Sequence, residues 1–378
     1  MKGFLITHKG MEDIASLELK EILGRNSEIN ETCVIFDIKK YDELFKLCYK
    51  SQSSIGIYFL LCQFEFDELF NDFEKNINDA DFNKWLDKNS SFAVKCRKDS
   101  LMPLPPTPEI EKKLGELIIN RIEKKHGYKQ KVNLENPDIS IFAYIKEKKV
   151  YVGIDFAGFD LSIRQYNIFK HPAAIKSTIA YCLIRLSEYN KKHALLDCFA
   201  GCGTIPLEAA LFASSLSINF FNKEKLNFTK FGRFKDYDFK GFFEKIDSEA
   251  NNDTLKIYNF EPSMKYLQYA KKNCKIAGID KKINFSRMDI EWLDTKFENG
   301  KIDKIATAFP LFDKKDADKI YREFFYQSDF ILAKNGVIAI SGNKEMIEKH
   351  ASKYKFMIAA QRKILSGKRE HEIFILCR

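Results

Sequence analysis

The stretch Leu195-Leu-Asp-Cys-Phe-Ala-Gly-Cys-Gly-Thr-Ile-Pro-Leu-Glu-Ala-Ala210 decides the fold of this chain. A short apolar run ends in Asp197, a loop of small residues comes next, and a helical pattern begins near Thr204. This order predicts the strand, turn and helix that open a doubly wound α/β domain, with a ligand beyond the carboxyl end of the strand. Gly201 and Gly203 would let the backbone approach that ligand closely, because glycine has no side chain in the way.

The composition of this loop argues against two common nucleotide sites. It lacks the Lys-Ser/Thr ending of a phosphate-cradling loop, so a nucleoside triphosphate is not expected. It also lacks the full G-x-G-x-x-G spacing, which makes NAD a weak second choice. A G-x-G turn can be merely structural, so its interpretation depends on the segments farther along the chain.

Three further segments continue the same pattern. Ile257-Tyr-Asn-Phe-Glu261 is an apolar run that ends in an acid, at the strand tip where the hydroxyls of a ribose are usually held. A helical pattern comes after it and stops at Gly278, a common helix end. Residues 283–290 predict a third strand that ends in another acid, and residues 302–312 predict a fourth strand with a proline-containing loop.

The order of these features resembles a class I S-adenosylmethionine-dependent methyltransferase. The resemblance implies an α/β, Rossmann-like domain with a seven-stranded sheet, completed by a terminal hairpin of residues 356–361 and 372–377. It also implies S-adenosylmethionine as the cofactor. The residues that would bind it are Asp197, Phe199, Ala200, Gly201, Gly203, Thr204, Glu261, Asp289 and Ile290.

Length and composition limit the class of protein. At 378 residues the chain should hold two or three domains, and 45% hydrophobic residues are ample for buried cores. We expect no membrane span, because no stretch of about 18 apolar residues occurs. The first residues do not form a secretion signal, and nine cysteines without C-x-x-C pairs indicate reduced thiols. We therefore expect a cytoplasmic protein, and the spacing of its six histidines suggests no metal site.

The distribution of charge suggests a polyanionic partner. The formal net charge is +9, yet residues 1–75 are net acidic by roughly five. Residues 76–176 are net basic by roughly five, and the remainder by roughly nine. A basic middle and C-terminal part suits a nucleic acid, although ordinary surface lysines would explain much of the excess.

The N-terminal half predicts two α+β units. Strands and helices alternate over residues 4–7, 12–23, 33–36, 41–48 and 55–66, an order that fits a small ferredoxin-like unit. A second unit opens with Ser91-Phe-Ala-Val-Lys-Cys-Arg-Lys98 and continues with a helix near 108–122. Two strands come next, at 139–145 and 150–156.

This second unit resembles a THUMP RNA-binding domain. The resemblance rests on the basic strand, the Glu109-Ile-Glu-Lys112 helix, Asn136-Pro-Asp138 and the exit Arg164-Gln-Tyr166. The segment His171-Pro-Ala-Ala-Ile-Lys176 is similar to the junction that precedes the methyltransferase domain in such enzymes. The whole chain is similar to the archaeal tRNA guanine-N2-methyltransferases that act in the acceptor stem, and this resemblance implies tRNA as partner.

The resemblance implies that the THUMP domain grips tRNA. Basic side chains suit this task, because phosphate contacts position a nucleic acid without reading its sequence. Our candidates for contact with the RNA backbone are Arg97, Lys98, Arg164 and Lys176. Arg164 could equally anchor one domain to the other.

The fourth strand departs from the family pattern. Such enzymes carry Asn/Asp-Pro/Leu-Pro-Tyr/Phe, in which carbonyl groups accept the hydrogens of the guanine amino group and the aromatic ring stacks on the flipped base. Here the place reads Thr307-Ala-Phe-Pro-Leu-Phe312. Pro310 is kept, Ala308 offers no side-chain acceptor, and Leu311 cannot stack as tyrosine would. Ala308, Pro310 and Phe312 are therefore the expected catalytic loop positions.

Two accounts of this loop compete. In one, Phe309 or Phe312 supplies the stacking ring, Asp313 or a backbone carbonyl accepts the protons, and the enzyme is active. In the other, the domain has lost methyl transfer and acts as a tRNA-binding module or partner subunit. Loss of one oriented group costs about 2–4 kcal/mol in other active sites, which is severe without being abolition. We expect an active enzyme, with a further protein partner left open.

The expected domain boundaries rest on these features. A ferredoxin-like domain would cover 1–75, a THUMP domain 76–160, a linker 161–172 and the methyltransferase domain 173–378. The methyltransferase domain carries a Phe-rich insertion at 222–253. The simplest interpretation of this insertion is a surface excursion with its own small core, and contact with RNA is an equal alternative.

Overall fold

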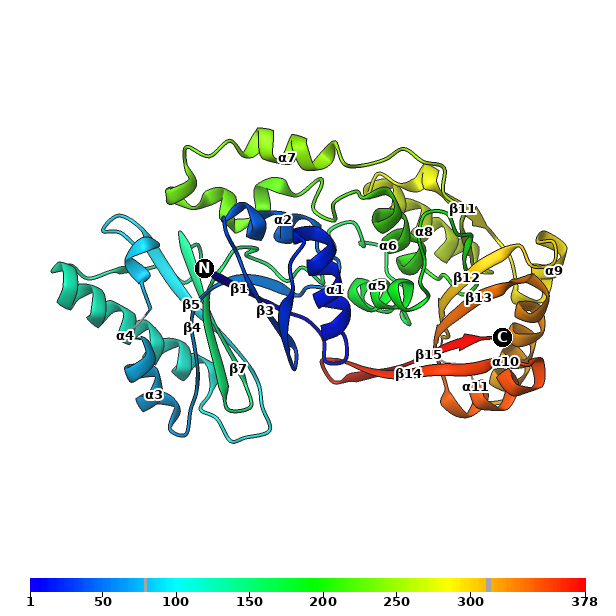
Figure 1. Ribbon diagram of the computed structural model, residues 1–378, viewed down its shortest axis with the longest axis horizontal. Helices are drawn as coiled ribbons and strands as arrows, with labels where there is room; N and C mark the ends of the chain where they lie inside the picture. The colour runs from blue at the N-terminus through cyan, green and yellow to red at the C-terminus, as the bar shows by residue number, and fades with distance from the viewer. Residues whose placement is uncertain (78–79, 311–313) are drawn as a thin grey trace.

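The computed structural model describes residues 1–77, 80–310 and 314–378. The strands of these residues form two sheets, one in each half of the chain (Figure 1). No helix within the described ranges is both long and apolar enough to span a membrane.

The first sheet has eight strands in the order β2-β3-β1-β4-β8-β7-β5-β6. Strand β4 pairs antiparallel with β8, with Tyr58 opposite Asp155, so a single sheet runs through the predicted ferredoxin-like and THUMP segments. The strands are β1 (Lys2–Ile6), β2 (Ser27–Asn30), β3 (Cys33–Asp37), β4 (Gly56–Glu65), β5 (Ser91–Asp99), β6 (Lys131–Val132), β7 (Ile139–Lys146) and β8 (Lys149–Asp155).

Helices cover one face of this sheet and bury their apolar stripes there. The helix predicted near 108–122 spans Thr107–His126, and the four apolar residues predicted to share one face, Ile110, Leu114, Ile118 and Ile122, are all buried. Strand β2 and helix α3 had no clear sequence signal. The helices are α1 (Glu12–Leu23), α2 (Asp42–Lys50), α3 (Leu69–Asn76) and α4 (Thr107–His126).

The second sheet has seven strands in the order β11-β10-β9-β12-β13-β15-β14, which confirms the predicted Rossmann-like architecture. Strands β10, β11, β9, β12 and β13 are parallel, and the last two strands form an antiparallel hairpin. The strands are β9 (Leu195–Asp197), β10 (Ile257–Phe260), β11 (Ile283–Ser286), β12 (Ile302–Ala308), β13 (Leu332–Ser341), β14 (Met357–Ser366) and β15 (Arg369–Cys377).

Helices flank the second sheet on both faces (Figure 1). The chain leaves β9, forms a helix and returns to β10, but β12 lies on the other side of β9, so strand order reverses beside β9. In open α/β sheets, ligands bind at such a reversal. These helices are α5 (Ser177–Leu186), α6 (Thr204–Ser214), α8 (Met264–Ile276), α9 (Leu293–Lys296), α10 (Lys314–Ile331) and α11 (Lys344–Ala351), whereas α7 (Phe239–Asp247) packs on the core of the first sheet.

The Phe-rich insertion packs into the core of the N-terminal half. The Phe228 ring stacks on Phe45 at 4.4 Å, and Phe231 meets Phe156 edge-on at 5.4 Å. The Phe228 N–H also donates to the carbonyl of Phe156. The interpretation of residues 222–253 as an excursion with its own small core is therefore wrong, because these rings complete a core that belongs to the other sheet.

The C-terminal hairpin makes a second bridge between the halves. Arg362 of β14 binds the Asp13 carboxylate of α1 through two hydrogen bonds of 2.6 and 2.7 Å. Lys9 and Leu365 form an isolated antiparallel bridge close by. The hairpin extends toward the N-terminal half in Figure 1. The two halves are thus joined by the insertion and by this hairpin.

Candidate functional site

A cavity of about 300 Å³ lies at the carboxyl ends of β9, β10 and β12. Asp197 ends β9, Glu261 follows β10 and Ala308 ends β12, so parallel strands bring these residues to one edge of the sheet. Eight of the nine predicted cofactor-binding residues line the cavity: Asp197, Phe199, Ala200, Gly201, Thr204, Glu261, Asp289 and Ile290.

Asp197 is the buried acid at the centre of this edge. Its Oδ1 accepts hydrogen bonds from the Thr307 hydroxyl at 2.6 Å and the Phe199 N–H at 3.2 Å. Burial raises the pKa of Asp197 to about 7, although these hydrogen bonds lower it in part. The carboxyl group is therefore fixed in direction and lies near its titration point at neutral pH.

Glu261 connects the second strand to the glycine turn. One carboxylate oxygen accepts the Gly201 N–H at 2.9 Å, and the other accepts the Ser263 N–H at 2.9 Å. Each carboxylate oxygen has a second lone pair, so both can still accept a hydroxyl hydrogen. Glu261 is only 7% exposed, which suits a carboxylate that meets its ligand inside a cavity.

The two glycines of the turn have different tasks. Gly201 has a φ of 51° and lines the cavity. Gly203 has a φ of 81° and does not line it; a Cβ there would lie 2.8 Å from the Cβ of Ala270 in α8. This glycine lets the turn pack closely against α8, and its contact with the cofactor stays a prediction.

Asp289 and Ile290 form the cavity wall beyond β11. The Asp289 side chain accepts the Ile290 N–H at 2.7 Å, which fixes the carboxylate at the start of a short 3₁₀ turn. Ile290 is 5% exposed and offers an apolar surface. A polar edge beside an apolar wall suits a planar heterocycle such as adenine.

The fourth strand brings Ala308 and Pro310 to the cavity wall. The Phe309 ring stacks on Tyr321 of α10 at 4.1 Å and 8° and meets Phe324 edge-on at 5.0 Å. It also lies 4.8 Å from the ring of Phe199 in the cavity wall, so a stacking role for Phe309 stays a prediction. Phe312, the other candidate ring, lies outside the described residues, as do Leu311 and Asp313.

Two aromatic residues in the cavity wall were missed as site residues. His171 precedes α5, Tyr266 lies in α8, and their rings meet edge-on at 4.1 Å. Burial lowers the pKa of His171, while the Glu261 charge raises it in part. Its Nδ1 accepts the Ala173 N–H at 3.0 Å, so the neutral ring carries its proton on Nε2 and presents a donor. The conspicuous His-Pro pair was the available signal.

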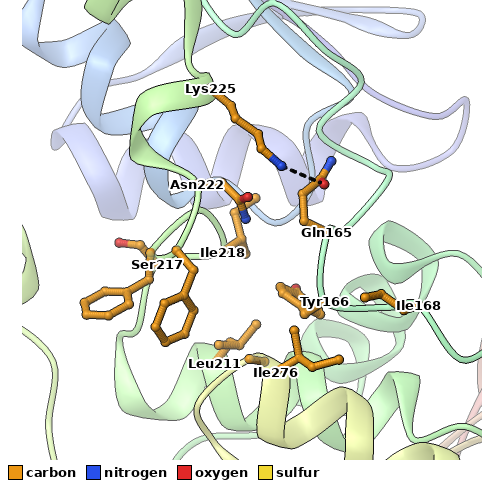
Figure 2. Close-up of a pocket in the computed structure, with 12 residues that line it drawn as sticks. Gln165, Tyr166, Ile168, Leu211, Ser217, Ile218, Asn222, Lys225 and Ile276 are labelled. Carbon is orange, nitrogen blue, oxygen red and sulfur yellow. Dashed lines mark hydrogen bonds between the residues drawn. The ribbon is translucent and has the colours of Figure 1, made fainter.

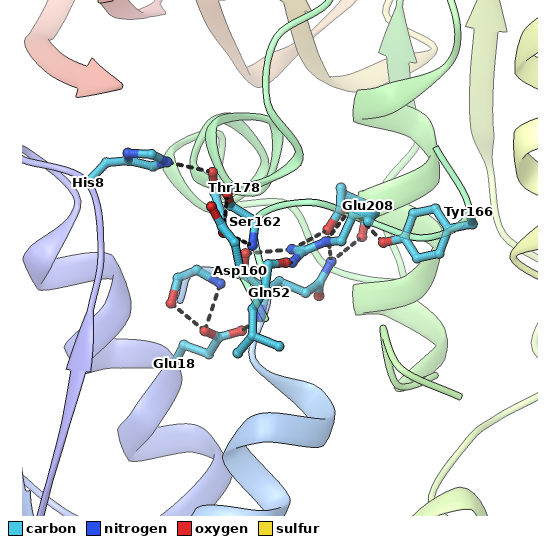
Figure 3. A network of polar contacts seen from close by, with 11 residues as sticks. His8, Glu18, Gln52, Asp160, Ser162, Tyr166, Thr178 and Glu208 are labelled. Carbon is cyan, nitrogen blue, oxygen red and sulfur yellow. Dashed lines mark hydrogen bonds and ion pairs between the residues drawn. The ribbon is translucent and has the colours of Figure 1, made fainter. Parts of the chain in front are cut away.

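Arg164 is buried between the two halves of the molecule. Its guanidinium is buried and binds both carboxylate oxygens of Glu208 in α6, at 3.1 and 3.2 Å. Tyr166 and Gln52 also donate to this carboxylate, each at 2.7 Å. In Figure 3, Gln52 lies between Glu208 and Glu18 of α1. The prediction for Arg164 as an RNA ligand is wrong, because the side chain anchors one half of the molecule to the other.

The other predicted RNA ligands remain exposed. Lys98 donates to the carbonyls of Leu104 and Pro105 in the proline-rich loop. Arg97 of β5 and Lys176 before α5 come from different halves, yet both lower the pKa of His8. Burial is the larger cause of that shift, which brings the pKa to about 4. Arg97 and Lys176 therefore both lie close enough to His8 to act on its charge, and Lys176 directly follows Ile175 in the cavity wall.

No group of three or more potential metal ligands occurs among His, Cys, Asp and Glu of the described ranges. The donor set of the cavity instead fits S-adenosylmethionine. Glu261 can accept two hydroxyl groups, Asp289 and Ile290 form a site for a base, and the Gly201 turn allows close approach.

Comparisons with known proteins agree with this geometry. The family model described as RMKL-like, methyltransferase domain matches residues 164–369, and the THUMP domain model matches 68–155. A tRNA (guanine(6)-N2)-methyltransferase of Methanocaldococcus jannaschii is 28% identical over 388 residues, covering 100% of both chains. An Archaeoglobus fulgidus protein with the same name is 25% identical, covering 83% of this chain and 76% of the relative.

Solved structures share the fold over the full length. A possible methylase from Clostridium difficile has a TM-score of 0.85 at 20% identity, covering 100% of this chain and 97% of that one. The structure of SMU.472 complexed with SAH has a TM-score of 0.82 at 20% identity, covering 99% and 97%. The predicted resemblance to THUMP-containing methyltransferases is thus confirmed. The methyltransferase family model matches more than half of the residues of this chain, so the chain belongs to the RMKL-like methyltransferase family.

Proposed function

We propose that this RNA methyltransferase transfers a methyl group to the exocyclic N2 of a guanosine in the acceptor stem of tRNA. The observation that carries the proposal is the position of Lys176. It directly follows Ile175 in the wall of the cofactor cavity, and its charge, like that of Arg97 from the THUMP segment, lowers the pKa of the largely buried His8. Two cations from different halves that both act on His8, one of them adjoining the cavity, suit a phosphate of the RNA strand that enters it. The names of the archaeal relatives support the choice of base and RNA.

The cofactor is S-adenosylmethionine, which supplies an electrophilic methyl group when bound. Glu261 would accept the ribose hydroxyls, and Asp289 with Ile290 would hold the adenine. The hydrogen bonds from Gly201 and Ser263 hold the Glu261 carboxylate in place before the cofactor arrives, so little reorganisation is needed.

The guanine amino group needs acceptors, because its lone pair is delocalised into the ring and must be directed at the methyl group. Ala308 offers no side-chain acceptor. We therefore assign this task to a backbone carbonyl of the turn from Ala308 to Pro310, because both of these residues line the cavity. The neutral His171 presents an Nε2 donor to the same cavity and can bind an acceptor atom of the cofactor or base.

A second function, a tRNA-binding module without methyl transfer, is favoured by one observation: the missing acceptor at Ala308. Mass spectrometry of tRNA nucleosides from cells with and without the gene separates the two functions. The proposed enzyme predicts the loss of N2-methylguanosine at one acceptor-stem position in the deletion strain, and restoration by the wild-type gene. Unchanged N2-methylguanosine at every position would contradict it.

A further inference from the structure

A row of partly exposed rings leads away from the cofactor cavity along α8. His171 meets Tyr266 at 4.1 Å, Tyr266 lies 6.0 Å from Tyr269, and Tyr269 lies 5.3 Å from Phe169. The first two rings line the cavity, and the last two lie outside it. We call these four residues the aromatic track.

The aromatic track is fixed to the cofactor loop by one buried side chain. The Asn273 amide accepts the Phe169 N–H at 3.0 Å and donates to the Phe169 carbonyl at 2.8 Å. The same amide nitrogen donates to the carbonyl of Cys202 at 3.2 Å. Asn273 therefore joins the segment before α5, helix α8 and the glycine turn by direct hydrogen bonds, which fix the position of the track relative to the cofactor loop.

Positive charge accompanies the track. The Lys265 ammonium lies 5.5 Å from the Tyr266 ring and 5.9 Å from the Tyr269 ring, and Lys272 lies 5.0 Å from Phe169. Helix α8 has four lysines and no acidic residue, and residues 165–176 also contain no acid. Rings interleaved with cations, without carboxylates on the same segments, suit a ligand that alternates planar bases with phosphates.

The far end of the track adjoins a second cavity, of about 290 Å³ (Figure 2). Ile168, next to Phe169, lines it together with Ile276 at the end of α8, and both side chains are exposed, at 62% and 39%. Lys225 lies at this cavity and donates to Gln165 at 3.2 Å. The apolar and basic surface thus extends along the whole length of α8.

We propose that the aromatic track binds unpaired nucleotides of the RNA next to the nucleoside in the active site. The inference rests on the proposed RNA substrate and adds where its single-stranded part lies. A target base must leave its stack to reach the cavity, so its neighbours are also freed from pairing. Base stacking on aromatic side chains tolerates any sequence, because every base has a π-face. A duplex keeps its bases stacked on one another and would not engage the rings.

Binding of fluorescein-labelled oligouridylate about eight nucleotides long to the full chain tests the proposal by fluorescence anisotropy. Tyr269→Leu removes a ring that lies outside the cofactor cavity, and we expect affinity to fall about fivefold or more. Tyr269→Phe keeps the ring and should retain most of the affinity. Lys240→Gln, on the exposed side of α7, is the matched control and should bind as the wild type does.

Lys272→Gln tests the phosphate part of the proposal. It should reduce the slope of log affinity against log salt concentration by about 0.7, the value for one phosphate contact on a single strand. Affinity for SAH, measured by calorimetry on each variant, should stay unchanged, which also shows that the variants are folded.

Equal affinity of wild type and Tyr269→Leu for the oligouridylate would overturn the proposal. The proposal would also be overturned if polyglutamate displaced the oligouridylate as effectively as an RNA of equal charge does, because an acidic peptide has no bases to stack. These outcomes are independent of the modified nucleoside. If Tyr269→Leu loses oligouridylate binding but the wild type forms no N2-methylguanosine, the aromatic track is supported and the proposed reaction is refuted. If Tyr269→Leu binds as the wild type does and the wild type forms N2-methylguanosine, the proposed reaction is supported and the aromatic track is refuted.

Discussion

Removal of Arg164 should destabilise the protein strongly, because its partner is a buried charge. Glu208 is fully buried and receives two hydrogen bonds from Arg164, one from Gln52 and one from Tyr166. Arg164→Met removes two of these and leaves the carboxylate without its counter-charge. Breaking a buried pair in this way costs about 3–5 kcal/mol. We expect a loss of that size in the free energy of unfolding.

Urea unfolding followed by circular dichroism measures this loss, and Arg362→Met is the matched control. Arg362 makes the same two-pronged contact to Asp13 between the same halves, but both partners are partly exposed. An exposed pair contributes at most about 1 kcal/mol. The double variant Arg164→Met with Glu208→Leu should regain much of the loss, because no unpaired charge remains. Equal destabilisation by Arg164→Met and Arg362→Met would refute the reasoning.

Three further predictions concern the cavity and the insertion. Glu261→Gln should weaken SAH binding about tenfold in calorimetry, because a charged acceptor is worth about 1.5–3 kcal/mol, while RNA affinity stays unchanged; equal SAH affinity would remove Glu261 from the site. Burial raises the pKa of Asp197 from 3.8 to about 7 in the folded state, so the folded state favours the protonated carboxyl group. The stability that this group contributes is therefore fully present below about pH 4 and is lost as the pH rises through 7. Asp197→Asn should therefore gain stability relative to wild type between pH 5 and 8 in urea unfolding, and a pH-independent difference would contradict the shift. Phe228→Ala should cost about 3–5 kcal/mol in the same assay, because the ring is fully buried against Phe45; a loss below about 1 kcal/mol would return the insertion to the surface.

The strand tips of the cofactor site could be predicted from the sequence. Asp197 and Glu261 each end an apolar run, and parallel strands place such ends at one edge of a sheet. The local pattern is sufficient for these two acids, whereas Ala308 was placed by the resemblance of the fourth strand to the family motif. The apolar spacing of α4 was sufficient for the same reason.

Contacts between distant segments could not be predicted in this way. The sequence shows that Arg164 carries a charge, but it does not show that the partner is Glu208, which lies within the apolar pattern of α6. His171 and Tyr266 are far apart in the sequence and meet where Asn273 ties the segment before α5 to α8. Strand β2 has polar residues without alternation and exists through its pairing with β3.

The composition of the insertion likewise indicated buried side chains, but it did not indicate which of the two sheets they pack against. Its phenylalanines contact one another, and they also pack against rings of α2 and the end of β8. A sequence pattern specifies which side chains avoid water. Only the folded chain determines which distant surface covers them.

The central claim, methyl transfer to the N2 of guanosine, is tested most directly with the purified chain. The protein is incubated with methyl-labelled S-adenosylmethionine and unmodified tRNA, and the nucleosides are separated by mass spectrometry. The account predicts that the wild-type protein, with Ala308 in its catalytic loop, forms labelled N2-methylguanosine. Label in any other nucleoside, or none in tRNA while the protein binds both cofactor and RNA, would contradict it.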